Sequence, residues 1–498
     1  MIKYFKNKVL ICVLLTYLGL FYLNGKQKGN SVILFHTVLL VLFSTGVFSA
    51  VWYLFYNNTI YTPFGGKGNY LIIAIYMLVY YYFGKLYGSF DLLVSKRGEL
   101  FYSNSIALLA ANIVTYIIIW LLTRLDLPNP LPLLLCIAAS AVIDLIWGYV
   151  AVWHTNKVWH PQNIILIYDN YEAFKNGKKI ARAYKNRFNI VKMLQVSDDM
   201  NGIFGQILES GAEAVMLCGI QSSPRNDLVK FCIKHSIVAY IRPNIGDLLI
   251  GESTTFMLNN LPVLRCQEAA PSVGYLFVKR LFDILVSGLG LVLLSPILLV
   301  TAIAIKAYDG GPVIFKQKRM TRNRKVFEIH KFRSMKVDAD KDGKGIVTMQ
   351  NDSRITPVGK VIRACRLDEL PQLWDILVGN MSVVGPRPER IETIELYEQE
   401  TPEFALRLQV KGGLTGYAQV YGKANTSPYD KLQMDLMYVG DQSIMTDLKI
   451  MLKTVKILFM PESTEGFDVE IDAAGEAPEE RVSDTGKANA GEKVTTLE

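Results

Sequence analysis

The sequence predicts a membrane protein in which N-terminal transmembrane helices precede two α/β regions. Three observations carry this prediction: apolar runs that nearly lack acidic residues up to residue 155, alternating short strands and helices over 156–268, and a motif-rich region over 271–461. The length of 498 residues corresponds to roughly three domains. Hydrophobic residues make up 51% of the chain, which excludes a disordered protein, and their concentration near the N-terminus excludes a simple soluble enzyme.

The N-terminal region contains four apolar runs of about the 20 residues that a helix needs to cross a bilayer; they lie at 31–56, 69–87, 102–124 and 130–152. A shorter run at 9–23 is predicted either as a fifth span or as a helix at the interface. Lys157 and the basic region after it place the rest of the chain in the cytoplasm. Asp144 lies inside the last span, where we expect a functional role or a pairing role.

Residues 156–268 are expected to form a small doubly wound, Rossmann-like α/β domain. Its predicted strands are Asn163–Tyr168, Phe188–Val196, Ala214–Gly219 and Ile237–Arg242, and helical stretches separate them. The first strand leads into Asp169-Asn170-Tyr171 and not into the glycine-rich turn that lets a backbone approach a pyrophosphate. We therefore predict regulation, assembly or spacing for this domain, and no catalysis.

The net charge of +8 combines a basic body with an acidic tail. Residues 462–498 contain eleven acidic and three basic side chains, so the preceding 461 residues carry a net charge of +16. The tail lacks apolar periodicity and is predicted to be disordered. The basic body is expected to attract anionic lipids and ligands that carry phosphate, in addition to the usual positive-inside bias.

A second kind of apolar segment covers residues 284–305, which contain no charged side chain. Pro296 lies near its middle and interrupts a helix there. Basic residues flank both ends, so a straight crossing would carry one basic cluster across the membrane. We predict a helix that breaks at Ser295 and Pro296 and leaves the bilayer on the side where it entered; the alternative is a kinked spanning helix.

Ten Lys and Arg but only two acidic residues lie between Lys306 and Lys336. Next to a membrane segment, such a cluster suits lipid phosphates and nucleotide phosphates, and no nucleic-acid partner is expected. Lys331 and Arg333 would point to one face of an extended chain. The alternative is a solvated edge strand.

The pair Asp368-Glu369 is the candidate for carboxylate chemistry. Asp368 followed by Pro371 fits a capped helix start, which is the structural interpretation. In the functional interpretation, both carboxylates border one pocket: one attacks phosphorus and the other holds a divalent metal such as Mg²⁺.

Two further motifs are consistent with phosphate chemistry, each with a structural alternative. Arg387 stands between two prolines that fix the backbone, so it presents a guanidinium rigidly or forms part of a tight turn. The glycine-dense stretch 412–419 lets backbone amides approach a nucleotide or is only a loop. Residues 444–459 are amphipathic and are expected either on the membrane surface or in the core.

The motifs together resemble the bacterial sugar transferase family of monotopic phosphoglycosyl transferases. Six occur in family order: KRLFDI (279–284), SP (295–296), KFRSM (331–335), LDELPQLW (367–374), VVGPRPE (383–389) and GLTGYAQV (413–420). The preceding spans and α/β domain resemble the long, polyprenyl-phosphate hexose-1-phosphate transferase branch. The resemblance implies four regions: transmembrane helices over 1–155, the α/β domain over 156–268, the catalytic domain over 271–461, and the tail.

The resemblance also implies an activity on the cytoplasmic face of the bacterial inner membrane. A UDP-sugar and Mg²⁺ would bind, Asp368 would attack the sugar-linked phosphate with release of UMP, and undecaprenyl phosphate would take up the sugar phosphate, as the first step of exopolysaccharide or capsule synthesis. The homo-oligomeric state is left open. The implied roles are catalysis for Asp368, Glu369, Lys331 and Arg333, metal binding for Glu369, phosphate binding for Arg387, Arg319, Gly385 and Pro386, and a membrane helix break at Ser295 and Pro296.

Two other function classes remain as alternatives. A membrane-anchored nucleotide-sugar epimerase or dehydratase requires the glycine turn that is missing after the first strand. A non-enzymatic membrane scaffold or transporter predicts that Asp368 is dispensable. The six cysteines lack CxxC spacing and only five histidines occur, so a disulfide framework and a histidine-rich metal centre are not expected.

Overall fold

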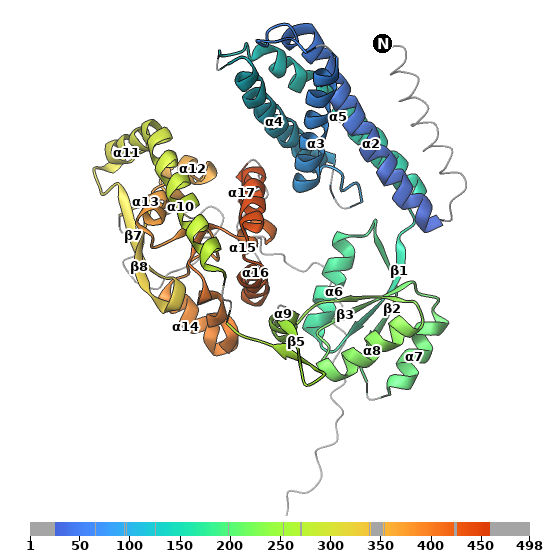
Figure 1. The fold of residues 1–498 in the computed structure, drawn as a ribbon. Coiled ribbons are helices and arrows are strands. Elements are labelled where there is room, and N and C mark those ends of the chain that lie inside the picture. The colour runs from blue at the N-terminus through green and yellow to red at the C-terminus, as the bar shows by residue number, and fades with distance from the viewer. Residues whose placement is uncertain are drawn as a thin grey trace, which may run out of the picture.

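The computed structural model describes residues 25–458, except for positions 65, 94, 96, 125, 198, 252, 269–270, 338, 340–351, 353 and 423–425. The predicted N-terminal apolar run, 9–23, and the predicted disordered tail, 462–498, lie outside the described residues. Along the chain, a helical bundle is followed by an α/β sheet and then by a mixed region that carries the sequence motifs (Figure 1).

The N-terminal bundle consists of α2 (Gly25–Val51), which continues into the π-helix η2 (Trp52–Tyr56), α3 (Lys67–Tyr87), α4 (Arg97–Leu122) and α5 (Leu131–Val158). Four of its helical stretches are long and apolar enough to cross a membrane, and they coincide with the four predicted N-terminal spans. An aromatic core holds the bundle together, with Phe48 stacked on Tyr76 at a ring separation of 4.0 Å.

Asp144 lies in the interior of this bundle, with 1% of its surface exposed. It interacts electrostatically with the Tyr80 hydroxyl on α3. Among the described residues, neither of its carboxylate oxygens has a hydrogen-bond partner. The residue therefore faces neighbouring helices and not the lipid.

The next region is a parallel four-stranded sheet in the order β2-β1-β3-β4. The strands are β1 (Gln162–Tyr168), β2 (Phe188–Gln195), β3 (Ala214–Cys218) and β4 (Val238–Ile241), and the helices between them are α6 (Tyr171–Ala183), α7 (Met200–Glu209) and α8 (Ser222–Lys234). The predicted strands are thus confirmed. Core residues lie on both faces of β1, as expected for a parallel sheet with helices on both faces.

The turn after β1 serves as a helix cap. The Asn170 side chain accepts a hydrogen bond from the Ala173 amide at 2.9 Å, so the residues in the position of a glycine fingerprint start α6 instead. A short helix, α9 (Ile245–Gly251), and an exposed hairpin, β5 (Thr254–Leu258) and β6 (Leu261–Arg265), lead to the last region.

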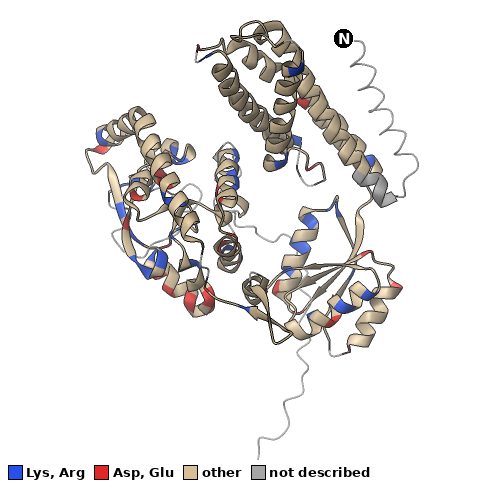
Figure 2. Cartoon of the chain, viewed as in Figure 1, with Lys and Arg blue, Asp and Glu red and all other residues tan. Residues whose placement is uncertain are grey.

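The last region contains small sheets surrounded by helices. Its strands form two pairs, β7 (Ile314–Met320) with β8 (Val326–Phe332) and β9 (Ser382–Val384) with β10 (Gly413–Thr415). The helical elements are α10 (Val273–Leu293), α11 (Ser295–Asp309), η3 (Arg322–Arg324), α12 (Pro357–Ala364), η4 (Leu367–Glu369), α13 (Gln372–Val378), α14 (Ile391–Glu400), η5 (Pro402–Gln409), α15 (Tyr417–Tyr421), α16 (Pro428–Gly440) and α17 (Ile444–Leu458). Lys and Arg gather along the β7–β8 hairpin (Figure 2).

The apolar segment is divided into α10 and α11, which meet at a bend of 61°. Pro296 lies in the first turn of α11, where its missing N–H would have no partner in any case. The Ser295 hydroxyl donates to the Val292 carbonyl oxygen at 2.7 Å. The sequence thus ends one helix and starts another at the predicted position.

Three polar side chains of α10 attach this helix to the rest of the region. Lys279 pairs with Asp447 of α17 at 2.8 Å. Arg280 donates to two carbonyl oxygens at the end of α13, each at 2.7 Å. Asp283 accepts hydrogen bonds from the Val383 amide at 2.9 Å and the Ser382 hydroxyl at 3.0 Å. The basic flank before the apolar segment thus contributes Lys279 and Arg280 to contacts within the protein.

We predict that Asp283→Ala destabilises the protein, because two buried donors lose their charged acceptor. The expected loss is about 2–4 kcal/mol, seen as a lower thermal unfolding midpoint of the protein purified in detergent. Asp227→Ala is the matched control, since Asp227 is exposed and pairs with Lys230 at the surface. Equal midpoints for the two variants would contradict this assignment.

Candidate active site

The two adjacent acids lie in a short 3₁₀ turn, η4, between α12 and α13. Arg366, directly before the turn, has a left-handed backbone with φ 53°. Neither η4 nor α13 is capped by a side chain, so the structural interpretation of Asp368 as a helix cap is wrong. Arg366 occupies the cap position of the turn, so Asp368 and Glu369 lie two and three residues past that position.

Glu369 pairs with two cationic side chains that come from distant parts of the chain. Its Oε1 atom lies 2.9 Å from Nζ of Lys331, which β8 carries, and 2.5 Å from Nη2 of Arg387, which follows β9. The Glu369 side chain is 13% exposed. The structure therefore brings Lys331, Glu369 and Arg387 together next to Asp368.

The two neighbouring carboxylates differ in their electrostatics. Burial opposes ionisation of Glu369, but the charges of Arg387 and Lys331 outweigh burial and hold its pKa well below the ordinary value. Burial, and then the charge of Glu369, raise the pKa of Asp368. Burial also lowers the pKa of Lys331. A carboxylate that is desolvated yet close to cations can attack an anionic phosphate, since the cations offset the repulsion.

Arg387 is held in place through its own backbone. Its carbonyl oxygen accepts a hydrogen bond from Arg407 at 2.9 Å, and Arg407 pairs with the buried Asp435 at 2.7 Å. Arg319 donates to the Pro388 carbonyl oxygen at 3.1 Å and lies 3.6 Å from Glu389. The loop is thus fixed by buried charges as well as by its prolines.

The glycines of the two loops allow backbone to pack against backbone. The Gly385 amide donates to the Thr415 carbonyl oxygen, and the Gly413 amide donates to the Pro386 carbonyl oxygen, each at 2.8 Å. A Cβ atom on Gly385, Gly413 or Gly416 would collide with backbone atoms of the facing loop. These amides shape the site by joining the loops, which is the structural alternative for this stretch. A phosphate contact by Gly385 and Pro386 remains a prediction.

Arg333 contacts a different partner from Lys331. It lies just beyond β8, is 7% exposed, and its guanidinium pairs with Asp309 at the end of α11. Lys331 instead reaches Glu369. The two cations predicted to act on one side therefore bind two different acids, and Arg333 joins β8 to the membrane segment.

Sequence reasoning missed several residues that support the site. Asp375 of α13 accepts hydrogen bonds from the backbone N–H and the ring Nδ1 of His330, at 2.9 and 2.7 Å, and so fixes the strand beside Lys331. Arg407 and Asp435 are separated from their partners by tens of residues, and no local motif indicates them. Asp375 directly follows the motif LDELPQLW (367–374). This position is the sequence feature that could have identified it as a residue supporting the site.

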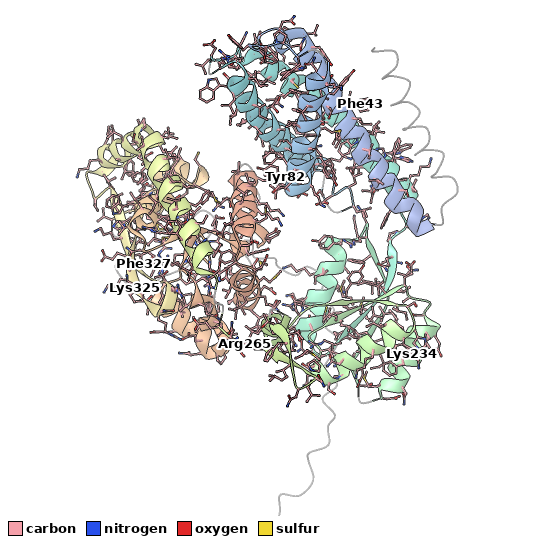
Figure 3. All side chains as sticks on the ribbon, viewed as in Figure 1. Phe43, Tyr82, Lys234, Arg265, Lys325 and Phe327 are labelled. Carbon is pink, nitrogen blue, oxygen red and sulfur yellow. The ribbon has the colours of Figure 1, made fainter. Side chains whose placement is uncertain are left out.

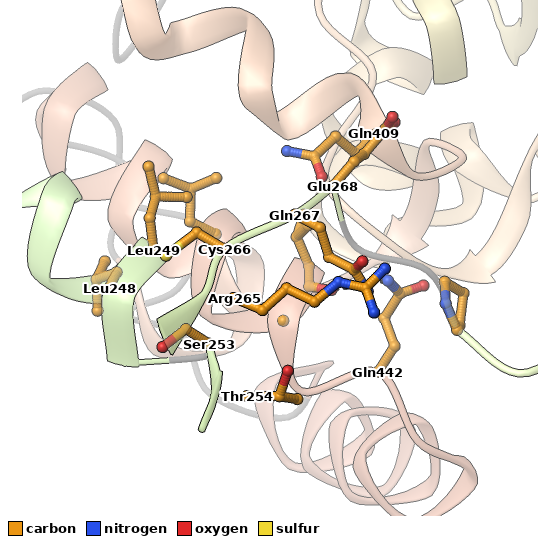
Figure 4. A pocket seen from close by; sticks show the side chains of 14 residues that line it. Leu248, Leu249, Ser253, Thr254, Arg265, Cys266, Gln267, Glu268, Gln409 and Gln442 are labelled. Carbon is orange, nitrogen blue, oxygen red and sulfur yellow. Dashed lines mark hydrogen bonds between the residues drawn. The ribbon is translucent and has the colours of Figure 1, made fainter. Parts of the chain in front are cut away.

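A pocket opens beside Glu369 and Arg387. Its apolar lining comes from Leu370 and from side chains of β9, β10, α15 and α17, and its other lining residues include Arg366, Thr415, Gln419 and Thr454. A second pocket lies at α9, the β5–β6 hairpin and α16, where Arg265 extends toward Gln442 (Figure 4). That pocket contains neither Asp368 nor Glu369.

Within the described residues, no group of three or more His, Cys, Asp and Glu side chains is arranged to hold a metal ion. The two carboxylates of η4 are hard oxygen donors of the kind that Mg²⁺ prefers. Glu369 already carries two cations on one oxygen. The donor set fits a Mg²⁺ ion that takes most of its ligands from a bound diphosphate.

Comparison with known proteins assigns the family. The bacterial sugar transferase family matches residues 274–461. The exopolysaccharide production protein PSS of Rhizobium leguminosarum bv. phaseoli is 42% identical over 191 residues, which cover 36% of this chain and 94% of that protein. The chain belongs to the bacterial sugar transferase family.

Longer relatives match as well. A UDP-glucose:undecaprenyl-phosphate glucose-1-phosphate transferase of Klebsiella pneumoniae is 43% identical over 223 residues, 44% of this chain and 48% of that protein. A protein of the same name in Escherichia coli K12 is 38% identical over 300 residues, 57% of this chain and 63% of that protein. The chain thus spans about half to two thirds of the length of these relatives.

Proposed function

We propose that this sugar transferase moves a hexose 1-phosphate from a UDP-sugar to a polyprenyl phosphate, undecaprenyl phosphate in bacteria, and releases UMP. The observation that carries the proposal is the pair Asp368-Glu369 with Lys331 and Arg387 bound to Glu369. The names of the relatives, which transfer glucose 1-phosphate to undecaprenyl phosphate, support the substrate class. The product is the lipid-linked sugar with which exopolysaccharide or capsule synthesis begins.

In the first step, a carboxylate oxygen of Asp368 attacks the phosphorus that carries the sugar. The new bond joins Asp368 to phosphorus, and the bond between that phosphorus and the bridging oxygen breaks, so UMP leaves with the electron pair. Arg387 and Lys331 offset the negative charge that accumulates around the phosphate. Their pairing with Glu369 holds them in place before substrate binds.

In the second step, a phosphate oxygen of the polyprenyl phosphate attacks the same phosphorus. The bond to Asp368 breaks, the free carboxylate returns, and a polyprenyl-diphosphate sugar forms. Glu369 is the residue that would hold Mg²⁺ beside the bound diphosphate. When bound, this ion supplies charge stabilisation at the phosphate oxygens. Arg319, Gly385 and Pro386 shape the loop that presents Arg387, and Arg333 holds β8 against α11.

The membrane arrangement is part of the proposal. The bend between α10 and α11 supports a re-entrant course that keeps both ends on the cytoplasmic face of the inner membrane. A polyprenyl chain stays in the bilayer because each CH₂ group contributes about 0.8 kcal/mol to membrane affinity. The site must therefore lie at the membrane surface, where it can reach the phosphate of the lipid. The middle α/β domain, 156–268, is proposed as a non-catalytic, Rossmann-like unit.

We predict that Asp368→Asn lowers turnover at least about a thousandfold, because the amide cannot form the phosphoenzyme bond. The measurement is UMP release from a UDP-sugar by protein in membranes with Mg²⁺ and polyprenyl phosphate. When the lipid is left out, intact-mass analysis should find one hexose phosphate bound to the wild-type enzyme and none bound to the Asp368→Asn variant. The matched control, Asp227→Asn, should behave as wild type. Turnover retained in Asp368→Asn, or an adduct on another side chain, would overturn the nucleophile assignment.

The raised pKa of Asp368 predicts the acid limb of the pH profile. Since the attacking group must be ionised, kcat/KM falls as the pH drops through the pKa of the folded protein, which lies above the ordinary value of about 3.9. Arg363 lowers the pKa of Asp368, so Arg363→Gln should shift this limb to higher pH. Lys360→Gln, an exposed change on the same helix, should leave it in place. A shift to lower pH in Arg363→Gln would disprove the assignment.

The re-entrant course is tested by labelling single cysteines in intact cells. Val273→Cys and Val337→Cys lie on either side of the α10–α11 pair and are 83% and 60% exposed. Both should resist a membrane-impermeant thiol reagent and react after permeabilisation. Tyr61→Cys, in the loop between η2 and α3, should react from outside. Opposite accessibility of the first two positions would establish a spanning helix instead.

A further inference from the structure

The pocket beside Glu369 is lined by two unlike kinds of side chain. Arg366, Glu369 and Arg387 are charged. Apolar side chains make up most of the remaining wall; they are Leu370, Val383, Leu414, Val420, Met451 and Ile457. A ligand that fills this pocket therefore has an anionic part and a largely apolar part. Both a prenyl phosphate and a pyrimidine nucleotide meet this description.

Gln419 distinguishes the two ligands. Its side chain lines the pocket, and both the Oε1 and Nε2 atoms are buried without a hydrogen-bond partner among the described residues. A buried amide that stays unpaired destabilises the protein, so a ligand that pairs with it is favoured. A prenyl chain has nothing to offer such an amide, whereas a nucleobase presents a donor next to an acceptor.

The amide is positioned by the loop glycines. Gly416 lies three residues before Gln419, and a Cβ atom there would come within 2.8 Å of Oε1 and would also collide with the Gly385 carbonyl oxygen. Glycine at this position lets the Gln419 side chain lie against the loop that carries Arg387. The pocket thus places one amide and one guanidinium on neighbouring backbone segments.

The wall opposite is formed by α17. Met451, Thr454 and Ile457 lie on one face of this helix and line the pocket, and the Thr454 and Thr415 hydroxyls are 2.6 Å apart. The other face of α17 contacts the N-terminal bundle, where Lys456 donates to the Tyr87 carbonyl oxygen at 2.8 Å. The helix that supplies part of the apolar wall is therefore also bound to the N-terminal bundle.

We propose that this pocket binds the uracil ring of the UDP-sugar and that the Gln419 amide pairs with the imide edge of the base. The amide oxygen accepts the N3–H of the base, and the amide N–H donates to an adjacent ring carbonyl. The apolar side chains cover the faces of the ring, and Arg387 binds the diphosphate. The proposal rests on the function proposed above and adds the residue that recognises the base.

The test measures equilibrium binding of UMP and of N3-methyl-UMP to the detergent-purified protein. Methylation removes the donor that the Oε1 atom of Gln419 accepts, so wild type should bind UMP at least about tenfold more tightly, the ratio that 1.4 kcal/mol gives. Gln419→Leu should weaken UMP and abolish the preference. Gln442→Leu, the same change in the other pocket, should keep it. The KM for polyprenyl phosphate should not change in Gln419→Leu.

Three outcomes would overturn the proposal: no preference in wild type, a preference that persists in Gln419→Leu, or a change in the KM for polyprenyl phosphate without a change in UMP binding. The comparison of the two ligands on wild type remains decisive where a variant does not fold. Because binding is measured without turnover, the result is independent of the Asp368→Asn experiment. Turnover retained in Asp368→Asn would contradict the proposed role of Asp368 as nucleophile, but it would not contradict the proposed binding of the base in this pocket.

Discussion

The double pairing of Glu369 with Lys331 and Arg387 is the interaction on which the rest of the site depends. The three charges come from η4, β8 and the loop after β9, and they meet at one oxygen atom. A buried charge that loses its partner costs about 3–5 kcal/mol, so any change that separates these elements is opposed by the charges themselves. Glu369 therefore fixes both cations and, through its own charge, raises the pKa of the neighbouring Asp368.

The membrane segment and the charged site are mechanically joined. Through Asp283, α10 holds the start of the β9 loop, and through Arg280 it holds the end of α13. From α11, Asp309 holds Arg333 at the end of β8. Each of the two elements that deliver a cation to Glu369 is thus tied to one half of the bent helix pair. A movement of that pair would be transmitted to the cations.

The sequence predicts the elements well where local pattern decides the structure. The four N-terminal spans follow from apolar length, and the strands of the α/β region follow from short apolar runs between turns. The break at Pro296 follows from the missing N–H of proline. The adjacency of Asp368 and Glu369 is a property of the sequence itself, and a basic, phosphate-directed region was indicated by composition.

The remaining features depend on contacts between distant segments, which no local pattern contains. The sequence shows Lys279 only as part of a basic flank, and its partner Asp447 lies 168 residues later in the chain. Asp368 fits a helix cap by spacing, and only the left-handed backbone of Arg366 places it elsewhere. Arg333 shares a motif with Lys331 yet binds an acid that lies before β7. In each case the partner decides the role of the residue.

Helix α17 shows how such contacts connect regions that look independent in sequence. It was predicted either for the membrane surface or for the core, and it lies between the transferase region and the bundle (Figure 1). Ile450 is buried in the transferase core, while Leu452 packs on the bundle core. Tyr82, at the end of the bundle that faces this helix (Figure 3), donates to Met445 at 3.6 Å. Since the same helix lines the pocket beside Glu369, the N-terminal spans do more than anchor the chain: they support one wall of the site.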